Sequence, residues 1–165
     1  MKDKVKKTSA LIWLILSIIL IALDQWTKHI AVANLTYGEA VPFVEGFWNW
    51  RLAHNTGAAF SFLADAGEWA HWFFVVMKIA VSLVLIGLLS KMPRNHWRDA
   101  LPYALIIAGA LGNLIDRFRY AYVIDFIEWY YKDFSWPVFN IADSCIVAGA
   151  VVLILFSFRK KEEVK

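Results

Sequence analysis

The stretch ALIWLILSIILIALDQWTKHIAVA, residues 10–33, decides the fold, because it opens on a long apolar run of the kind that crosses a lipid bilayer. A helix that spans the hydrocarbon core needs about 20 predominantly apolar residues. Polar side chains enter only in the second half of the stretch, at Asp24, Gln25, Lys28 and His29. They separate the apolar run from the A-x-A motif at residues 31–33, so we expect an uncleaved membrane span and not a secretory signal.

Three further apolar stretches follow, at residues 69–90, 100–116 and 138–158. Basic residues gather before the first span, between the second and third, and after the fourth, and such clusters mark cytoplasmic ends. The clusters are Lys2, Lys4, Lys6 and Lys7; Lys91, Arg94 and Arg98; and Arg159, Lys160, Lys161 and Lys165. We therefore expect both termini in the cytoplasm and the segments 34–68 and 117–137 outside.

The composition agrees with a membrane protein. Hydrophobic residues make up 60% of the chain, whereas apolar residues make up about 45–50% of soluble domains. Charged residues make up 19%. This excludes a disordered tail and a typical soluble enzyme. The clusters that flank the spans explain the net charge of +3, so we expect no nucleic-acid partner. A single cysteine excludes an internal disulfide, and the four histidines are scattered, so we expect no metal and no cofactor.

Both outside segments contain strand patterns. In FWNWRLAH, residues 47–54, apolar and polar side chains alternate, with Trp48, Trp50 and Leu52 on one face and Asn49 and Arg51 on the other. YVIDFI, residues 122–127, is rich in β-branched and aromatic residues. The sequence thus predicts an α-helical integral membrane protein, a single domain over residues 1–165. It has four transmembrane helices and a small extracytoplasmic β-sheet at the outer membrane interface.

Polar residues recur at the outer ends of three predicted spans, although a charge inside a bilayer costs at least about 2.5–3.5 kcal/mol. They are Asp24, Gln25 and Lys28 on the first span, Asn113, Asp116 and Arg117 on the third, and Asn140 and Asp143 on the fourth. Structural interpretations stay open for two pairs. Asp24 and Lys28 have the i,i+4 spacing of a helical ion pair, and Asp116 with Arg117 can form a salt bridge at a helix end.

Asp125 and Asp143 are the candidate catalytic pair, because one lies in an apolar strand and the other inside an apolar helix, where a lone carboxylate is costly. Two aspartates at one site share a proton, since repulsion raises one pKa. The ionised one can activate water while the neutral one donates a hydrogen bond to a scissile carbonyl. Cys145 lies about 200° around the helix from Asp143, which disfavours a cysteine nucleophile. Lys78, in the second span, is either a transport residue or a lysine that reaches the interface or backbone carbonyls.

Five short motifs occur in order along the chain. They are DQWTK at residues 24–28, NTGAAF at 55–60, GALGNLIDR at 109–117, VIDF at 123–126 and FNIADS at 139–144. With the four spans, they cover nearly the whole chain. In these motifs the chain resembles the bacterial lipoprotein signal peptidases, the signal peptidase II family.

The resemblance implies a metal-free aspartic endopeptidase of the bacterial cytoplasmic (inner) membrane, whose catalytic residues are Asp125 and Asp143. Its substrates would be diacylglyceryl-modified prolipoproteins, cut immediately before the lipidated cysteine near the outer leaflet, and globomycin would inhibit it. Membrane lipids are its other expected partners, and we expect a monomer. Residues implied to bind substrate or support the pair are Asn55, Asn113, Arg117, Asn140, Asp24, Lys28 and Asp116. The alternative is a non-enzymatic membrane carrier or binding protein for a lipid or small solute, in which the acidic residues couple to protons and Lys78 is central.

Overall fold

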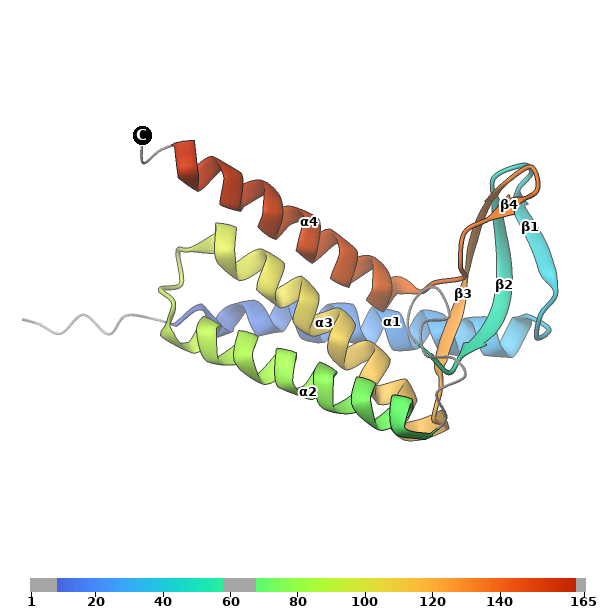
Figure 1. Ribbon diagram of the computed structural model, residues 1–165, viewed down its shortest axis with the longest axis horizontal. Helices are drawn as coiled ribbons and strands as arrows, with labels where there is room; N and C mark the ends of the chain where they lie inside the picture. Colours follow the sequence, from blue (N-terminus) through green and yellow to red (C-terminus); the bar gives the residue numbers. More distant parts are fainter. Residues whose placement is uncertain (1–8, 58–67, 163–165) are drawn as a thin grey trace, which may run out of the picture.

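The computed structural model describes residues 9–57 and 68–162. In chain order, its elements are η1 (Ala10–Trp13), α1 (Leu14–Asn34), β1 (Ala40–Val44), β2 (Trp48–Asn55), α2 (Glu68–Lys91), α3 (Trp97–Tyr120), β3 (Val123–Tyr131), β4 (Phe134–Ser135) and α4 (Ile141–Glu162). Figure 1 shows the long helices side by side and the sheet across one end of the bundle. The start of α1 and the end of α4 lie at the opposite end.

Within the described residues, four helices are long and apolar enough to cross a membrane, over Ala10–Asn34, Trp72–Lys91, Trp97–Tyr120 and Ile141–Phe158. Large apolar side chains on α1, α2 and α4 point outward, as expected of surfaces that face lipid. Helix α3 is the most enclosed, because it packs against the other three. The sequence places the third span at residues 100–116, whereas α3 continues to Tyr120. Its polar end continues as a helix because Asn113, Asp116 and Arg117 are buried in protein.

Two glycines allow α3 and α4 to approach closely. A Cβ atom at Gly149 would lie 2.9 Å from the carbonyl oxygen of Pro102 and 2.7 Å from Ile106 Cγ1. At the other end of the contact, Gly109 faces the carbonyl of Ala142 with no room for a side chain. The first turn of α4 is thereby held against the middle of α3, where small residues favour close helix packing in membranes.

The four strands form an antiparallel sheet in the order β1-β2-β3-β4. Asn49 and Arg51 both bond to Glu128, while Trp48 and Trp50 contact each other with ring centroids 4.8 Å apart, so the alternation expected of β2 is present there. The register of β2 against β3 shifts between Trp50 and Ala53. Beyond this bulge, Ala53 pairs with Asp125 and Asn55 with Val123, which brings the end of β2 beside Asp125.

Candidate active site

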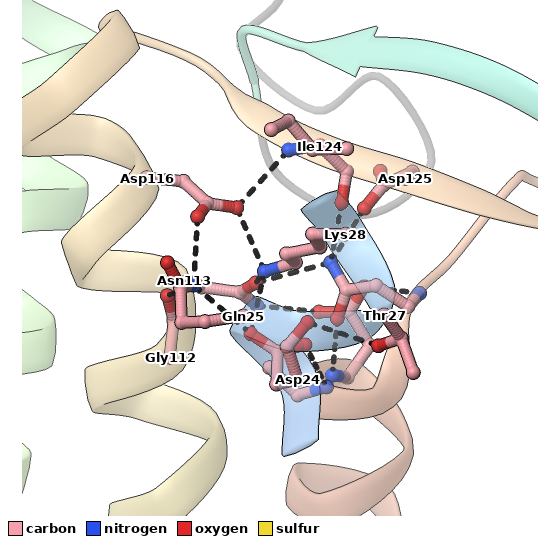
Figure 2. A network of polar contacts seen from close by, with 12 residues as sticks. Asp24, Gln25, Thr27, Lys28, Gly112, Asn113, Asp116, Ile124 and Asp125 are labelled. Carbon is pink, nitrogen blue, oxygen red and sulfur yellow. Dashed lines mark hydrogen bonds and ion pairs between the residues drawn. The ribbon is translucent and has the colours of Figure 1, made fainter. Parts of the chain in front are cut away.

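Side chains from five elements meet where the helical bundle joins the sheet. Helix α1 supplies Asp24, Gln25 and Lys28, α3 supplies Asn113, Asp116 and Arg117, β2 and β3 supply Asn55 and Asp125, and the start of α4 supplies Asn140 and Asp143. Figure 2 shows the α1 and α3 residues pointing toward one another below β3. The structure thus brings together every residue that the sequence singled out for this level of the membrane.

A buried ion cluster forms the base of the site. Lys28 Nζ lies 2.8 Å from Asp24 Oδ2 and 2.7 Å from Asp116 Oδ2, and it donates to Asn113 Oδ1 at 3.0 Å (Figure 2). All three charged side chains are 2% exposed or less. Two carboxylate oxygens and an amide oxygen therefore surround the one ammonium group. Removing one member of a buried pair typically costs about 3–5 kcal/mol, because a charge is left uncompensated.

The same acids anchor the elements that carry the catalytic candidates. Asp24 Oδ1 accepts the N–H of Ala142, in the first turn of α4, at 2.9 Å. Asp116 Oδ2 accepts the N–H of Ile124, in β3, at 3.2 Å. These bonds dock the start of α4 and the start of β3 onto α1 and α3. The i,i+4 pair of Asp24 and Lys28 is present, but as part of a larger network than the spacing indicates.

Asn140 connects Asp125 and Asp143. Its Nδ2 donates to Asp125 Oδ1 at 2.6 Å. Its Oδ1 accepts the Asp143 N–H at 2.8 Å, and its own N–H donates to Asp143 Oδ2 at 3.3 Å. This reciprocal pattern is a capping box, in which the residue before a helix and the third helical residue satisfy each other's N–H groups. The cap that starts α4 therefore also fixes Asp143 relative to Asp125.

Two further asparagines hold the carboxylates. Asn113 Nδ2 donates to Asp143 Oδ1 at 2.7 Å, and Asn55 Nδ2 donates to Asp125 Oδ2 at 3.0 Å. Asp125 is 1% exposed. Burial, and then the neighbouring Asp143 carboxylate, raise the pKa of Asp125 to about 8, against the opposing effect of the hydrogen bonds from Asn55 and Asn140. A pair of this kind retains a proton at neutral pH.

Arg117 contacts the chain that follows β2. Its Nη1 donates to the carbonyl of Thr56 at 3.2 Å, and its Nη2 donates to the carbonyl of Gly57. The Phe74 ring of α2 lies 5.2 Å from the guanidinium carbon. Asp116, the neighbour of Arg117 on α3, pairs with Lys28. Asp116 and Arg117 thus bind separate partners and do not form the helix-end salt bridge that their adjacent positions suggest. The remaining residues of the NTGAAF motif, Ala58–Phe60, lie outside the described residues.

Sequence reasoning placed Gln25 at the polar end of the first span without giving it a role, and it missed Glu128 of β3. Gln25 Nε2 donates to the Gly112 carbonyl at 3.1 Å and to Asp116 Oδ1 at 2.9 Å, so it joins α1 to α3. Its place beside Asp24 at the polar end of the first span was the available signal. Glu128 accepts from Asn49, Arg51 and Ser135. Burial favours the neutral form of Glu128, but these hydrogen bonds hold its pKa below the ordinary value.

Paired carboxylates such as Asp125 and Asp143 are suited to general acid–base chemistry. Among residues 9–57 and 68–162, no group of three or more His, Cys, Asp or Glu side chains is placed to hold a metal ion. A pocket of about 270 Å³ borders the ion cluster, since Lys28, Asp116 and Ile124 are among its lining residues, and Ile124 lies on the face of β3 opposite Asp125. Two carboxylates on asparagine supports, at the end of a bundle of membrane-spanning helices, characterise a multi-pass membrane peptidase of the aspartic type.

Comparison with known proteins identifies the family. The model of the signal peptidase (SPase) II family matches residues 16–159, and the chain belongs to that family. It is 52% identical over 153 residues to a lipoprotein signal peptidase of Xanthomonas oryzae pv. oryzae (strain PXO99A), with 93% of this chain and 92% of the relative covered. It is 54% identical over 149 residues to one from Xylella fastidiosa (strain M12), with 90% and 89% covered.

Solved structures agree with this assignment. A bacterial membrane enzyme determined by the in meso method at 2.3 Å resolution superposes with a TM-score of 0.82 at 28% identity, covering 93% of this chain and 91% of that one. A second, determined at 1.9 Å, gives a TM-score of 0.73 at 30% identity, with 87% and 90% covered. The predicted fold class, four membrane helices with a small sheet, is confirmed. The chain is an aspartic-type signal peptidase, and a carrier function is not favoured.

Proposed function

We propose that this signal peptidase cuts diacylglyceryl-modified prolipoproteins immediately before the lipidated cysteine, with Asp125 and Asp143 as its catalytic pair. Membership of the signal peptidase II family supports the removal of signal peptides from prolipoproteins. The observation that carries the residue assignment is the position of Asn140, whose amide bonds Asp125 while its cap bonds hold Asp143. Both carboxylates therefore face one reaction centre.

In the proposed mechanism, the pair holds one proton. The ionised aspartate takes a proton from a water molecule, whose oxygen attacks the scissile carbonyl, while the protonated aspartate donates a hydrogen bond and then its proton to the carbonyl oxygen. The tetrahedral intermediate collapses when the amide nitrogen receives a proton, the C–N bond breaks and the hydroxyl proton returns to the pair. The signal peptide leaves with a new carboxylate, and the lipidated cysteine becomes the new N-terminus.

The other site residues have supporting roles in this proposal. Asn55, Asn113 and Asn140 orient the carboxylates, each through a side-chain amide within 3.0 Å of a carboxylate oxygen. Asp24, Lys28 and Asp116 form the buried base that docks α4 and β3. Arg117 positions the backbone after Asn55 beside the pair and offers donors to the substrate.

The membrane arrangement explains why a lipidated substrate suits this site. Basic clusters at the ends of the spans support a cytoplasmic-membrane protein with both termini inside and the sheet at the outer leaflet. In this proposal residues 1–165 act as a single domain. A diacylglyceryl group keeps the substrate cysteine at that leaflet, at the level of the pair. One copy of the chain contains every residue used here, so the proposed enzyme works as a monomer among membrane lipids.

The test is a cleavage assay with the purified full-length protein in lipid nanodiscs. We expect a diacylglyceryl-modified precursor to be cut and the same precursor without the lipid to be spared, with mass spectrometry showing the lipidated cysteine at the new N-terminus. Globomycin should block the reaction. Equal cleavage of both precursors, or a cut elsewhere, would overturn the proposed specificity.

A further inference from the structure

Lys78 lies inside the apolar helix α2, where its surroundings differ from those of Lys28. Lys28 has two carboxylates and an amide within 3.0 Å of its ammonium group. For Lys78, no hydrogen bond or ion pair is present within residues 9–57 and 68–162, and its Nζ lies 5.6 Å from the centre of the Phe74 ring. Charged groups at membrane depth normally pair with an anion or with carbonyl oxygens. The ammonium group of Lys78 is therefore available to an acceptor that arrives with a ligand.

Phe74 places this ammonium group near the catalytic candidates. The ring is 4% exposed and also contacts Arg117 of α3, so the Lys78 side chain extends over a ring that faces the bundle interior. It runs from Lys78 back toward Phe74, one turn nearer the sheet end of α2. A lysine that merely reached past the bundle surface would not cover an enclosed ring.

The level of Lys78 follows from helix geometry. Helices α2 and α3 are packed neighbours that run in opposite directions (Figure 1). Phe74 of α2 and Arg117 of α3 are in contact and therefore lie at the same level. One turn farther from the sheet, Lys78 follows on α2 and Asn113 on α3, so these two residues also lie at one level. Asn113 donates to Asp143 at 2.7 Å. The charged groups that interact with Lys78 are those of this site, namely Arg117, Asp143, Lys28 and Asp125. The ammonium group thus lies at the depth of the reaction centre, on the α2 side.

We infer that Lys78 is a substrate-binding residue, whose ammonium group donates to a carbonyl oxygen beside the scissile bond. The inference rests on the proposed function. Two carbonyl sources reach this depth in the proposed substrate. One is the ester groups of the diacylglyceryl moiety, which is attached to the cysteine just after the cut. The other is the last turn of the signal helix, whose final four carbonyls have no partner within the helix. Lys78 forms and breaks no covalent bond in either case.

The experiment measures KM and kcat for Lys78→Met, which keeps an unbranched side chain and removes the charge. We expect KM for the diacylglyceryl precursor to rise about tenfold with kcat within about twofold, because a binding contact is lost. Lys78→Arg should recover most of the affinity. Lys91→Met, the same change at the far end of α2, is the matched control and should behave as wild type. An unchanged KM, or a fall in kcat alone, in a variant with normal thermal unfolding would overturn the inference.

A second substrate distinguishes the two carbonyl sources. In a dialkyl ether analogue of the lipidated precursor, the ester carbonyls are absent. If Lys78→Met raises KM only for the diester, the acceptor is an ester; if it raises KM for both substrates, the acceptor is a peptide carbonyl, and either result supports the inference. The Asp143→Asn variant tests the proposed function separately from the role of Lys78. An inactive Asp143→Asn beside a fully normal Lys78→Met overturns the role of Lys78 alone, whereas an active Asp143→Asn overturns the proposed function.

Discussion

At the scale of single residues, Asn140 has two roles. Its side chain caps the N-terminus of α4, and it also links the two carboxylates. The depth of Asp143 and Asn113 in the spans, with the cost of a lone carboxylate at Asp125 in an apolar strand, was enough to predict that the three residues lie at one level. The partners of each residue were not predictable, because they depend on where α4 begins and on the register of β3. Arg117 illustrates this limit, since it bonds backbone carbonyls and not the neighbouring Asp116.

The pH dependence of activity follows from Asp125, whose pKa is raised to about 8 by burial and then by Asp143. The pair needs one proton, so kcat/KM should fall as pH rises above about 8. The hydrogen bond from Asn55 favours the ionised form and lowers this pKa. Asn55→Ala should therefore move the alkaline limb to higher pH.

This shift can be measured in profiles of kcat/KM from about pH 5 to about pH 10. Asn34→Ala, at the exposed end of α1, is the control and should leave the limb unmoved. An alkaline limb that moves to lower pH in Asn55→Ala would contradict the assigned role of this hydrogen bond.

At the scale of elements, hydropathy was sufficient to predict four membrane helices and alternation was sufficient to predict β2. The bulge between Trp50 and Ala53 was not predictable, because its position depends on the pairing of β2 with β3. That bulge sets the pairing that brings Asn55 to Asp125. The length of α3 was also underestimated, since its polar end is enclosed by other elements and does not meet lipid.

The Asp24→Asn variant tests whether Asp24 holds the start of α4 in place. It accepts the Ala142 N–H and pairs with buried Lys28, so Asp24→Asn should lower the free energy of unfolding by about 3 kcal/mol. The turnover per folded molecule should change much less, because Asp24 does not contact Asp125 or Asp143. Thermal unfolding and active-site-normalised kcat measure the two effects. Glu39→Gln, at an exposed position, is the control; normal stability with lost turnover would place Asp24 in the chemistry.

At the scale of the whole molecule, the orientation in the membrane decides which substrates reach the site. The bundle puts the sheet at one end and both ends of the described chain at the other (Figure 1). We expect a cysteine at Glu45, in the turn between β1 and β2, to react with an impermeant thiol reagent in intact cells, and one at Asn95, between α2 and α3, to react only after lysis. Both variants need Cys145→Ala, because Cys145 is the only natural cysteine. Labelling of position 95 from outside would contradict the topology.

The central claim is that Asp125 and Asp143 act as one catalytic unit. The direct measurement is kcat of Asp125→Asn, Asp143→Asn and the double variant on a diacylglyceryl-modified precursor, with thermal unfolding to show that each is folded. Asparagine keeps the shape and removes the acid–base function, so each single variant should lose nearly all activity, and the double variant should be hardly worse than either, because residues that act as a unit are not additive. Near-normal turnover in either folded single variant would contradict the account.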